Sequence, residues 1–351
     1  MNNIPKKMKF ATLVKDHEAE VRTRDLPEIG EHDVLLKMQA CNICTTDYQQ
    51  WMGLREHQGY PMAGGHESAG IVVAKGSKVN DFEIGDHVAC GYSGCGHCES
   101  CLDGDYASCS SGRSDTYDGY KWGYFGFSDY VVKSVVGLYK VSKSLDPSCA
   151  GFLEPIATVI HGMNKLRVKP FETVVVIGAG TMGLLNAQVA RSYGARVIVS
   201  ELMERKLETA KKMGFEVIDG KNEDAVKRVM ELTENKGADA VIPAVGASIA
   251  YQQGLDMLKQ NDGRFLVFAA GYPAPELKID ANEIHYRRIE IIGTFAAIND
   301  DFKQAAKALS TGIVDVSYLV EDEKFKLDDI QSAYEYASQP GMYRVSVLLD
   351  K

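Results

Sequence analysis

The chain has 351 residues, a formal net charge of −9, 45% hydrophobic residues and 25% charged residues. This composition is typical of a globular protein and excludes a disordered or fibrous chain. The acidic balance argues against binding to the phosphate backbone of nucleic acids and to anionic membranes. At this length we expect about two domains, each with its own core.

The N-terminal segment, residues 1–21, carries early lysines but no apolar run that resembles a signal peptide. No later segment offers the roughly 18 consecutive apolar residues that a transmembrane helix needs. We therefore expect a cytoplasmic protein without a membrane or nucleic-acid partner. In that reducing compartment, clustered cysteines are more often metal ligands than disulfides.

Short β-like runs dominate the chain from about residue 8 to residue 150. They lie at 33–40, 68–74 and 127–133 and are separated by glycine-rich and polar stretches. Such runs are typical of an irregular, mostly β domain.

The pattern changes near residue 151 to apolar strands that alternate with helical stretches. The strands lie at 173–180, 196–201, 238–246 and 264–271, and the helices include 183–194 and 203–214. Strands buried on both faces with helices between them predict an α/β domain with a parallel sheet. Pro243 lacks a ladder N–H, so we expect it at the end of its strand. After residues 289–295 the alternation weakens, and we expect the chain to return to the first domain.

A glycine-rich turn follows the first of these strands. The motif "VVVIGAGTMG", residues 174–183, has the G-x-G-x-x-G spacing after a strand and before a helix, which favours dinucleotide binding. Glu201 ends the next strand, where a carboxylate can accept both ribose hydroxyls of NAD and repel a 2′-phosphate. Arg205 and Lys206 could instead reach a 2′-phosphate, so NADP stays open. The predicted cofactor-binding residues are Gly178, Gly180, Thr181, Met182, Gly183, Glu201 and Lys206.

Four cysteines are concentrated in the stretch "CGHCESCLDGDYASC", residues 95–109. Four thiolates close a tetrahedral zinc shell and leave no open position for a substrate. We therefore predict a structural zinc lobe over about residues 90–112, with Cys90 and His97 outside the ligand set. Nucleic-acid-binding zinc modules use similar shells, but the acidic balance and the nucleotide motif argue against that class. The predicted structural ligands are Cys95, Cys98, Cys101 and Cys109.

Several motifs in one order resemble the zinc-dependent medium-chain alcohol and polyol dehydrogenases, and among them the sorbitol dehydrogenase-like branch. The series contains "CNICTTD", "GGHESAG", "FEIGDHV", the four-cysteine lobe, "GFSDYVV", "FLEPIATVIHG" and "VVVIGAGTMG". The resemblance implies a GroES-like catalytic domain, residues 1–155 and 295–351, and a central Rossmann domain, residues 156–294. It also implies two zinc ions per chain, an active site between the domains, and a homo-oligomer, either a dimer or a tetramer.

The resemblance assigns the catalytic zinc by position. Cys44 and His66 resemble the first two ligands, and Glu67 resembles the carboxylate that either ligates or supports the metal. Glu154 stands where alcohol dehydrogenases have a second cysteine and sorbitol-like enzymes a glutamate. We do not expect Cys149, five residues before Glu154, to be the third ligand.

Two further residues receive catalytic roles from the resemblance, and two others depart from it. Thr46 resembles the hydroxyl that takes the substrate proton, and Asp47 the carboxylate that orients the metal ligands. Asn42 replaces the usual glycine before Cys44. Gln49 replaces a relay histidine, and an amide cannot exchange protons at neutral pH.

The implied activity is hydride transfer between NAD and a polyol, sugar or cyclitol. The aromatic and polar loop at residues 113–127 suits a polyhydroxylated ligand. Alternatives are a secondary-alcohol or amino-acid-alcohol dehydrogenase of the same family and a non-catalytic zinc- and nucleotide-binding protein. A sugar phosphate is also open, with four candidate basic residues. These are Arg55, His57, Arg113 and Lys121.

Overall fold

The computed structural model describes residues 4–110, 116–271 and 273–349. Its chain divides into two compact units, one made of Met1–Ala157 with Ala297–Lys351 and the other of Thr158–Ala296. Along the part of the chain that is described, no helix combines the length and the apolar composition of a membrane span.

The first unit is built on a seven-stranded sheet. Its order is β16-β17-β3-β4-β5-β9, and β8 also pairs with β3. These strands are β3 (Asp33–Ile43), β4 (Glu67–Lys75), β5 (His87–Cys90), β8 (Tyr130–Ser134), β9 (Leu138–Lys140), β16 (Val320–Lys326) and β17 (Arg344–Leu348). Two hairpins accompany the sheet, β1 (Lys7–Lys15) with β2 (Glu18–Asp25) and β6 (Thr116–Tyr117) with β7 (Tyr120–Lys121).

Short helices connect the strands of the first unit. They are α1 (Thr45–Trp51), α2 (Glu99–Leu102), α3 (Pro147–Ala150), α10 (Asn299–Ser310) and α11 (Ile330–Ala337), with 3₁₀ turns at Glu56–Gln58, Tyr106–Ser108, Ser317–Leu319 and Leu327–Asp329. Helix α4 (Leu153–Leu166) contains the boundary between the two units.

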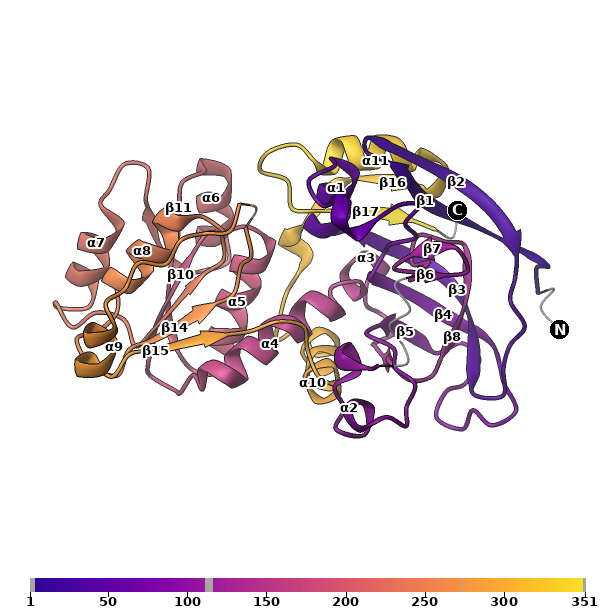
Figure 1. Ribbon diagram of the computed structural model, residues 1–351, viewed down its shortest axis with the longest axis horizontal. Helices are drawn as coiled ribbons and strands as arrows, with labels where there is room; N and C mark the ends of the chain where they lie inside the picture. The colour runs from indigo at the N-terminus through magenta and orange to yellow at the C-terminus, as the bar shows by residue number, and fades with distance from the viewer. Residues whose placement is uncertain (1–3, 111–115, 272, 350–351) are drawn as a thin grey trace. The chain divides into compact units, whose positions relative to one another are not determined.

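The two ends of the chain meet in this sheet. Strand β17 runs antiparallel to β3, with Val345 opposite Ile43 and Leu348 opposite Ala40. Figure 1 shows yellow β17 beside the indigo-to-purple strand β3. Apolar residues of both strands enter one buried core, including Met38, Ile43 and Val345. The last part of the chain therefore completes a sheet that the first part begins.

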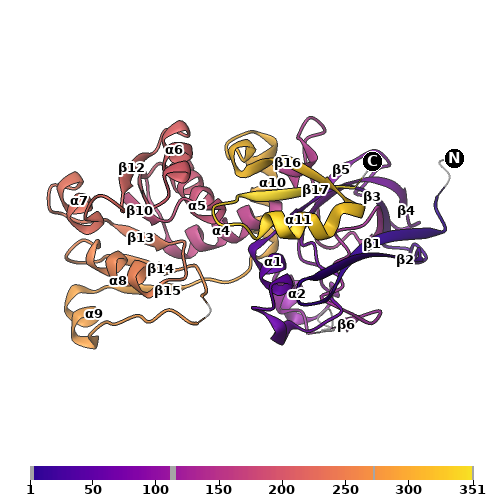
Figure 2. The same ribbon diagram turned by 90° about the horizontal axis from the view of Figure 1, so that it is seen from above.

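The second unit is a six-stranded parallel sheet in the order β12-β11-β10-β13-β14-β15 (Figure 2). Its strands are β10 (Thr173–Ile177), β11 (Arg196–Glu201), β12 (Glu216–Asp219), β13 (Ala240–Pro243), β14 (Arg264–Val267) and β15 (Glu290–Gly293). Its helices are α5 (Thr181–Ser192), α6 (Glu204–Lys212), α7 (Ala225–Leu232), α8 (Ser248–Asp256) and α9 (Ala281–Arg287). This strand order is that of the Rossmann fold, and the predicted α/β class is confirmed.

The central strand β10 explains why this sheet is covered on both faces. Its residues Val174, Val175 and Val176 are fully buried, although successive side chains point to opposite faces. Helices α5 and α8 both pack against β10 and lie on opposite faces of the sheet (Figure 1). Pro243 is the last residue of β13, as predicted. At that position its missing N–H breaks no hydrogen bond within the ladder of strands. The strand order reverses between β10 and β13, which is where such sheets bind ligands.

Candidate metal centres and dinucleotide site

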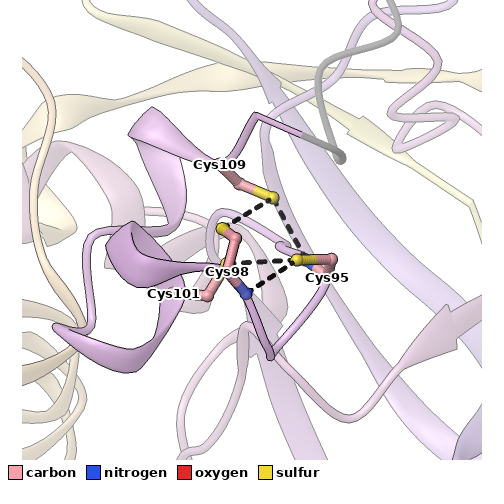
Figure 3. Close-up of side chains that lie close together, drawn as sticks. All are labelled: Cys95, Cys98, Cys101 and Cys109. Carbon is pink, nitrogen blue, oxygen red and sulfur yellow. Dashed lines mark hydrogen bonds between the residues drawn. The ribbon is translucent and has the colours of Figure 1, made fainter.

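The cysteine-rich lobe brings four sulfur atoms within 4.8 Å of one another (Figure 3). The Sγ atoms of Cys95 and Cys101 are 3.9 Å apart. Those of Cys98 and Cys109 are also 3.9 Å apart. Four sulfurs at about 2.3 Å from a tetrahedral zinc would lie about 3.8 Å from each other. The four thiols therefore fit a zinc ion and would complete its coordination shell.

Backbone N–H groups point at these sulfurs. The N–H of Cys98 lies 3.4 Å from the Cys95 sulfur, and the N–H of Cys95 lies 3.2 Å from the Cys109 sulfur (Figure 3). Donors stabilise a thiolate, and the backbone N–H of His97 is the largest cause that lowers the pKa of Cys95. The loop thus favours at Cys95 the deprotonated form that zinc requires, whereas burial raises the pKa of Cys101.

The residues next to the lobe's sulfurs have other contacts. The exposed ring of His97 places Nδ1 2.8 Å from the carbonyl oxygen of Cys95. Cys90 is buried in the hydrophobic core of the first unit. Gly94 has no room for a side chain, because a Cβ there would lie 2.5 Å from the sulfur of Cys101. Neither His97 nor Cys90 belongs to the sulfur group.

A second group of potential metal ligands lies elsewhere in the same unit. Ligand atoms of Cys44, His66 and Glu67 lie within 4.8 Å of one another. Cys44 is the N-cap of α1 and directly follows β3, while Glu67 is the first residue of β4. Strands β3 and β4 are antiparallel partners, and Asn42 is opposite Glu67. The strand pairing therefore assembles this group from two separate segments.

Asp47 holds the two segments in place. Its side chain is fully buried, and its Oδ2 accepts the N–H of Cys44 at 3.0 Å while its Oδ1 lies 3.5 Å from the N–H of Gly65. His66 Nδ1 lies 3.8 Å from Asp47 Oδ2. Burial raises the pKa of Asp47, and the charge of His66 opposes that rise. Asp47 thus caps the helix that carries Cys44 and also faces the imidazole.

Glu67 is paired with an arginine from the C-terminal strand. The guanidinium of Arg344, at the start of β17, donates from Nη2 to Glu67 Oε1 at 2.7 Å and from Nε to Oε2 at 2.8 Å. Its Nη2 also lies 3.4 Å from Cys44 Sγ. Burial disfavours the charged guanidinium, yet the charge of Glu67 raises the pKa of Arg344 above its usual value. Arg344 did not emerge from the sequence analysis, although a charged residue inside an apolar strand was a usable signal.

Glu154 lies in the first turn of α4, outside the group of Cys44, His66 and Glu67. Its Oε1 accepts a hydrogen bond from the hydroxyl of Tyr92. Burial raises the pKa of Glu154, while the charge of His66 acts in the opposite direction. Tyr92 was not singled out from the sequence, which holds no local signal for this contact.

Other predicted residues occupy defined positions near the cluster. Thr46 is partly exposed in the first turn of α1. Gln49 accepts from Arg55 Nε at 2.9 Å. Asn42 is fully buried, and its amide donates to the carbonyl oxygen of Ser148 at 2.9 Å, which ties β3 to α3. Asn42 thus continues β3 instead of starting a turn.

The side chains around His66 carry an excess of potential negative charge. Four of them can carry a negative charge and only one carries a positive charge. The four are the carboxyl groups of Asp47, Glu67 and Glu154 and the thiol of Cys44, and the one is the guanidinium of Arg344. Such an imbalance is costly in a buried site unless a cation offsets it. His66 Nδ1 is also buried without a hydrogen-bond partner within the described residues. Thiolate, imidazole and carboxylate donors together fit zinc.

The glycine-rich turn after β10 leaves space for a ligand at one glycine only. A Cβ at Gly183 would lie 1.8 Å from the carbonyl oxygen of Gly178, and Gly178 itself has a φ of 101°. At Gly180 a Cβ would meet only the Lys206 ammonium, at 3.7 Å. Thr181 and Met182, with Gly183, form the first turn of α5. The turn therefore fits a pyrophosphate approaching its backbone at Gly180.

Glu201 is already engaged with the backbone. Its Oε2 accepts the N–H of Ala179 at 2.6 Å, and its Oε1 accepts those of Leu202 and Met203 at 2.7 and 2.9 Å. A carboxylate has about four acceptor positions, so about one is left in this conformation. The role of Glu201 in binding the ribose hydroxyls stays a prediction.

The aromatic loop lies beside the second ligand group. The ring centroids of Trp122 and Tyr124 are 5.8 and 6.0 Å from that of His66. Trp122 has a φ of 66° and Phe125 one of 50°, a conformation that bulky residues rarely adopt. Such strain persists only where the surrounding structure enforces it. The loop therefore holds two aromatic rings against the predicted metal ligand.

Three of the four predicted basic residues lie within the described part of the chain. Arg55 donates to Gln49, Lys121 packs beside Gly59, and His57 lies in the 3₁₀ turn at Glu56–Gln58. Arg113 lies outside the described residues, as do residues 111–112 of the predicted lobe. Cys149 lies in α3, and burial raises its pKa to about 11. It does not belong to the ligand group of Cys44.

Comparison with known proteins agrees with this arrangement. The family model described as zinc-binding dehydrogenase matches residues 181–311, and that of the alcohol dehydrogenase GroES-like domain matches residues 30–143. A sorbitol dehydrogenase of Bacillus subtilis is 30% identical over 349 residues, which cover 96% of each chain. The chain belongs to the zinc-binding dehydrogenases. The family and the enzyme class expected from the sequence are thereby confirmed.

Two further zinc-binding dehydrogenase relatives extend the comparison. A sorbitol dehydrogenase of Halalkalibacterium halodurans is 31% identical, with 90% of this chain and 91% of the relative covered. A solved structure from Sinorhizobium meliloti, described as a zinc-binding dehydrogenase bound to NADP, has a TM-score of 0.86 and 27% identity. It covers 98% of this chain and 100% of its own.

Proposed function

We propose that this zinc-binding dehydrogenase oxidises a secondary hydroxyl of a polyol or sugar with NAD. Cys44 and His66 hold the catalytic zinc, with Glu67 and Glu154 as the carboxylates that complete or support its shell. The observation that carries the proposal is the group of Cys44, His66 and Glu67, in which His66 and Glu67 are buried, together with the excess of potential negative charge around His66. Two sorbitol dehydrogenases among its relatives support the polyol class.

The chain's own residues have distinct tasks in this reaction. Zinc, when bound, polarises a hydroxyl and lowers its pKa, as it lowers that of water to about 7 in other enzymes. Asp47 fixes Cys44 and faces His66, so it orients both ligands. The hydroxyl of Thr46 accepts the substrate proton. As it does so, Thr46 passes its own proton to solvent water, because the amide of Gln49 cannot relay a proton.

Cofactor choice depends on the charges beside the glycine-rich turn. Glu201 places a carboxylate at the end of β11, where it favours NAD over NADP. Lys206 opposes this preference, since its ammonium lies beside Gly180. We expect the ratio of kcat/KM values for NAD and NADP to favour NAD, and Glu201→Ala to lower that ratio. If the ratio of kcat/KM values is unchanged in Glu201→Ala, Glu201 does not determine the choice between NAD and NADP.

The aromatic rings beside His66 support a polyhydroxylated substrate. Sugar C–H faces pack on aromatic rings, while the rings of Trp122 and Tyr124 exclude water from the reacting carbon. The cytoplasm, where thiols stay reduced, suits the two cysteine-containing zinc sites. We also propose a dimer or tetramer, as symmetric oligomers are the commonest assemblies of soluble enzymes. Light scattering of the purified enzyme measures that state.

The test is NADH formation on a panel of polyols, sugars, sugar phosphates, simple secondary alcohols and amino-acid alcohols. The proposal predicts turnover with polyols or sugars and its loss in Thr46→Val, while zinc content and NADH binding stay unchanged. Thr46→Ser, which keeps the hydroxyl, is the control and retains turnover. If simple secondary alcohols or amino-acid alcohols are preferred, they are the substrate class in place of polyols and sugars. A zinc-loaded protein that binds NADH but oxidises no alcohol would overturn the proposal.

A further inference from the structure

The phenol of Tyr92 contacts the one predicted ligand that stands apart from the others. Tyr92 follows β5 and precedes the cysteine lobe. Its hydroxyl donates to Glu154 Oε1, and a hydrogen bond to a carboxylate is stronger than one between neutral groups. This bond restrains one of the two oxygens of the Glu154 carboxylate. The geometry gives Tyr92 direct control over the Glu154 carboxylate.

Packing fixes the ring of Tyr92 independently of Glu154. The ring meets Phe302 of α10 edge-on, with centroids 5.1 Å apart and planes at 82°. Phe302 is fully buried and stacks on Tyr139 at 5.1 Å and 14°. The hydroxyl of Tyr139 makes a separate hydrogen bond, to Asn299 Oδ1 at 2.8 Å. These three rings form an aromatic column that holds the Tyr92 hydroxyl in place.

The backbone before Tyr92 is confined by the same column. A Cβ added at Gly91 would lie 2.8 Å from ring atoms of both Phe302 and Tyr139. The chain therefore passes too close to the column for any residue but glycine. This close approach leaves Tyr92 little freedom to move its hydroxyl away from Glu154. The Glu154 carboxylate is thus oriented by a rigid donor.

We propose that Tyr92 is a positioning residue for the catalytic metal site and acts through Glu154. This inference rests on the proposed function for the role of Glu154 as a metal carboxylate. The Tyr92 hydroxyl restrains Oε1, so Glu154 presents one oxygen in a fixed direction. Without the hydroxyl, Glu154 Oε1 loses this donor, and the metal's ligand field and its retention both change. Tyr92 itself does not touch the reacting atoms.

The test compares Tyr92→Phe with Tyr139→Phe in the full chain. Both changes keep an aromatic ring of the column and remove one hydroxyl, but only the first removes the bond to Glu154. Cobalt(II) replaces the catalytic zinc, and its visible absorption reports the ligand set without any substrate. We expect Tyr92→Phe to change this spectrum and to speed metal loss to a chelator by about 10-fold or more. Tyr139→Phe keeps the wild-type spectrum and rate.

A double-mutant cycle with Glu154→Gln separates positioning from a general structural effect. If Tyr92 acts through Glu154, adding Tyr92→Phe to Glu154→Gln changes the spectrum and the metal loss no further. In Tyr92→Phe we also expect kcat to fall more than KM rises. Wild-type metal loss and spectrum in Tyr92→Phe would overturn the proposal, as would additive effects in the double variant. Because both metal readouts need no substrate, they stay decisive even if no polyol is oxidised.

Discussion

The two ligand groups of the first unit differ in how the chain assembles them. The four cysteines of the lobe come from fifteen consecutive residues, 95–109, and form a group of sulfur ligands alone. The second group gathers Cys44, His66 and Glu67 from separate segments and adds Arg344 from β17. The first group is closed and chemically uniform. The second is mixed, partly buried and surrounded by groups that can direct a reaction.

This difference teaches which features belong to structure and which to catalysis. A shell of four thiolates leaves no position for a substrate, so its metal can only stabilise the loop. A site with three unlike donors, and with a hydroxyl two residues after Cys44 at Thr46, leaves room for chemistry. The same contrast predicts that the two sites respond differently when one ligand is removed.

Removal of Cys44 has the largest expected effect on turnover. Cys44→Ser should lose the catalytic zinc and all measurable alcohol oxidation, because the thiolate both binds the metal and offsets its charge. The lobe's zinc and the thermal unfolding midpoint should change little. Cys149→Ser, a partly exposed cysteine outside both groups, is the matched control and should keep activity. Zinc content and NADH formation measure the outcome; full turnover in Cys44→Ser contradicts the assignment.

Removal of a lobe ligand should act on stability instead. Cys98→Ser opens the closed shell, and loss of a structural metal costs about 4 kcal/mol or more. We expect a lower thermal midpoint and loss of one zinc, with the Cys44 site still able to bind cobalt at low temperature. His97→Ala, in the same lobe but outside the sulfur group, is the control. An unchanged midpoint with one zinc missing would show that the lobe's metal stabilises nothing.

A smaller effect is expected when a supporting carboxylate changes. Asp47→Asn keeps the shape of the side chain but leaves one oxygen for two N–H donors, from Cys44 and Gly65. Loss of such support lowers metal affinity or activity by about 10- to 100-fold. Asp146→Asn, which alters the cap of α3 through Ser148, serves as the control. The change is measured as metal affinity, in competition with a chelator. Wild-type affinity in Asp47→Asn would show that Asp47 does not support the metal site.

Local sequence patterns were sufficient for part of this account. The cysteine lobe and the turn of Gly178, Gly180 and Gly183 are recognisable because their residues are neighbours in the chain. The same applies to the strand-and-helix alternation of the second unit. Each of these patterns has one physical explanation, either metal coordination, backbone space or burial.

Local sequence patterns could not predict the long-range contacts. The pairing of β17 with β3 brings Arg344 to Glu67, and the return of α10 brings Phe302 to Tyr92. Periodicity holds no information on which distant strands pair. The backbone contacts of Glu201 were also missed, because a carboxylate at the end of a strand can face either a ligand or its own loop.

The most direct test of the central claim is the time course of zinc removal by a chelator, with zinc per chain, turnover and secondary structure followed together. The account predicts two zinc ions per native chain. The first is lost together with all turnover while the fold is intact, and the second is lost only as the protein unfolds. Turnover that persists after the first zinc has left, or a single zinc whose loss unfolds the chain, would contradict the division into a catalytic and a structural site.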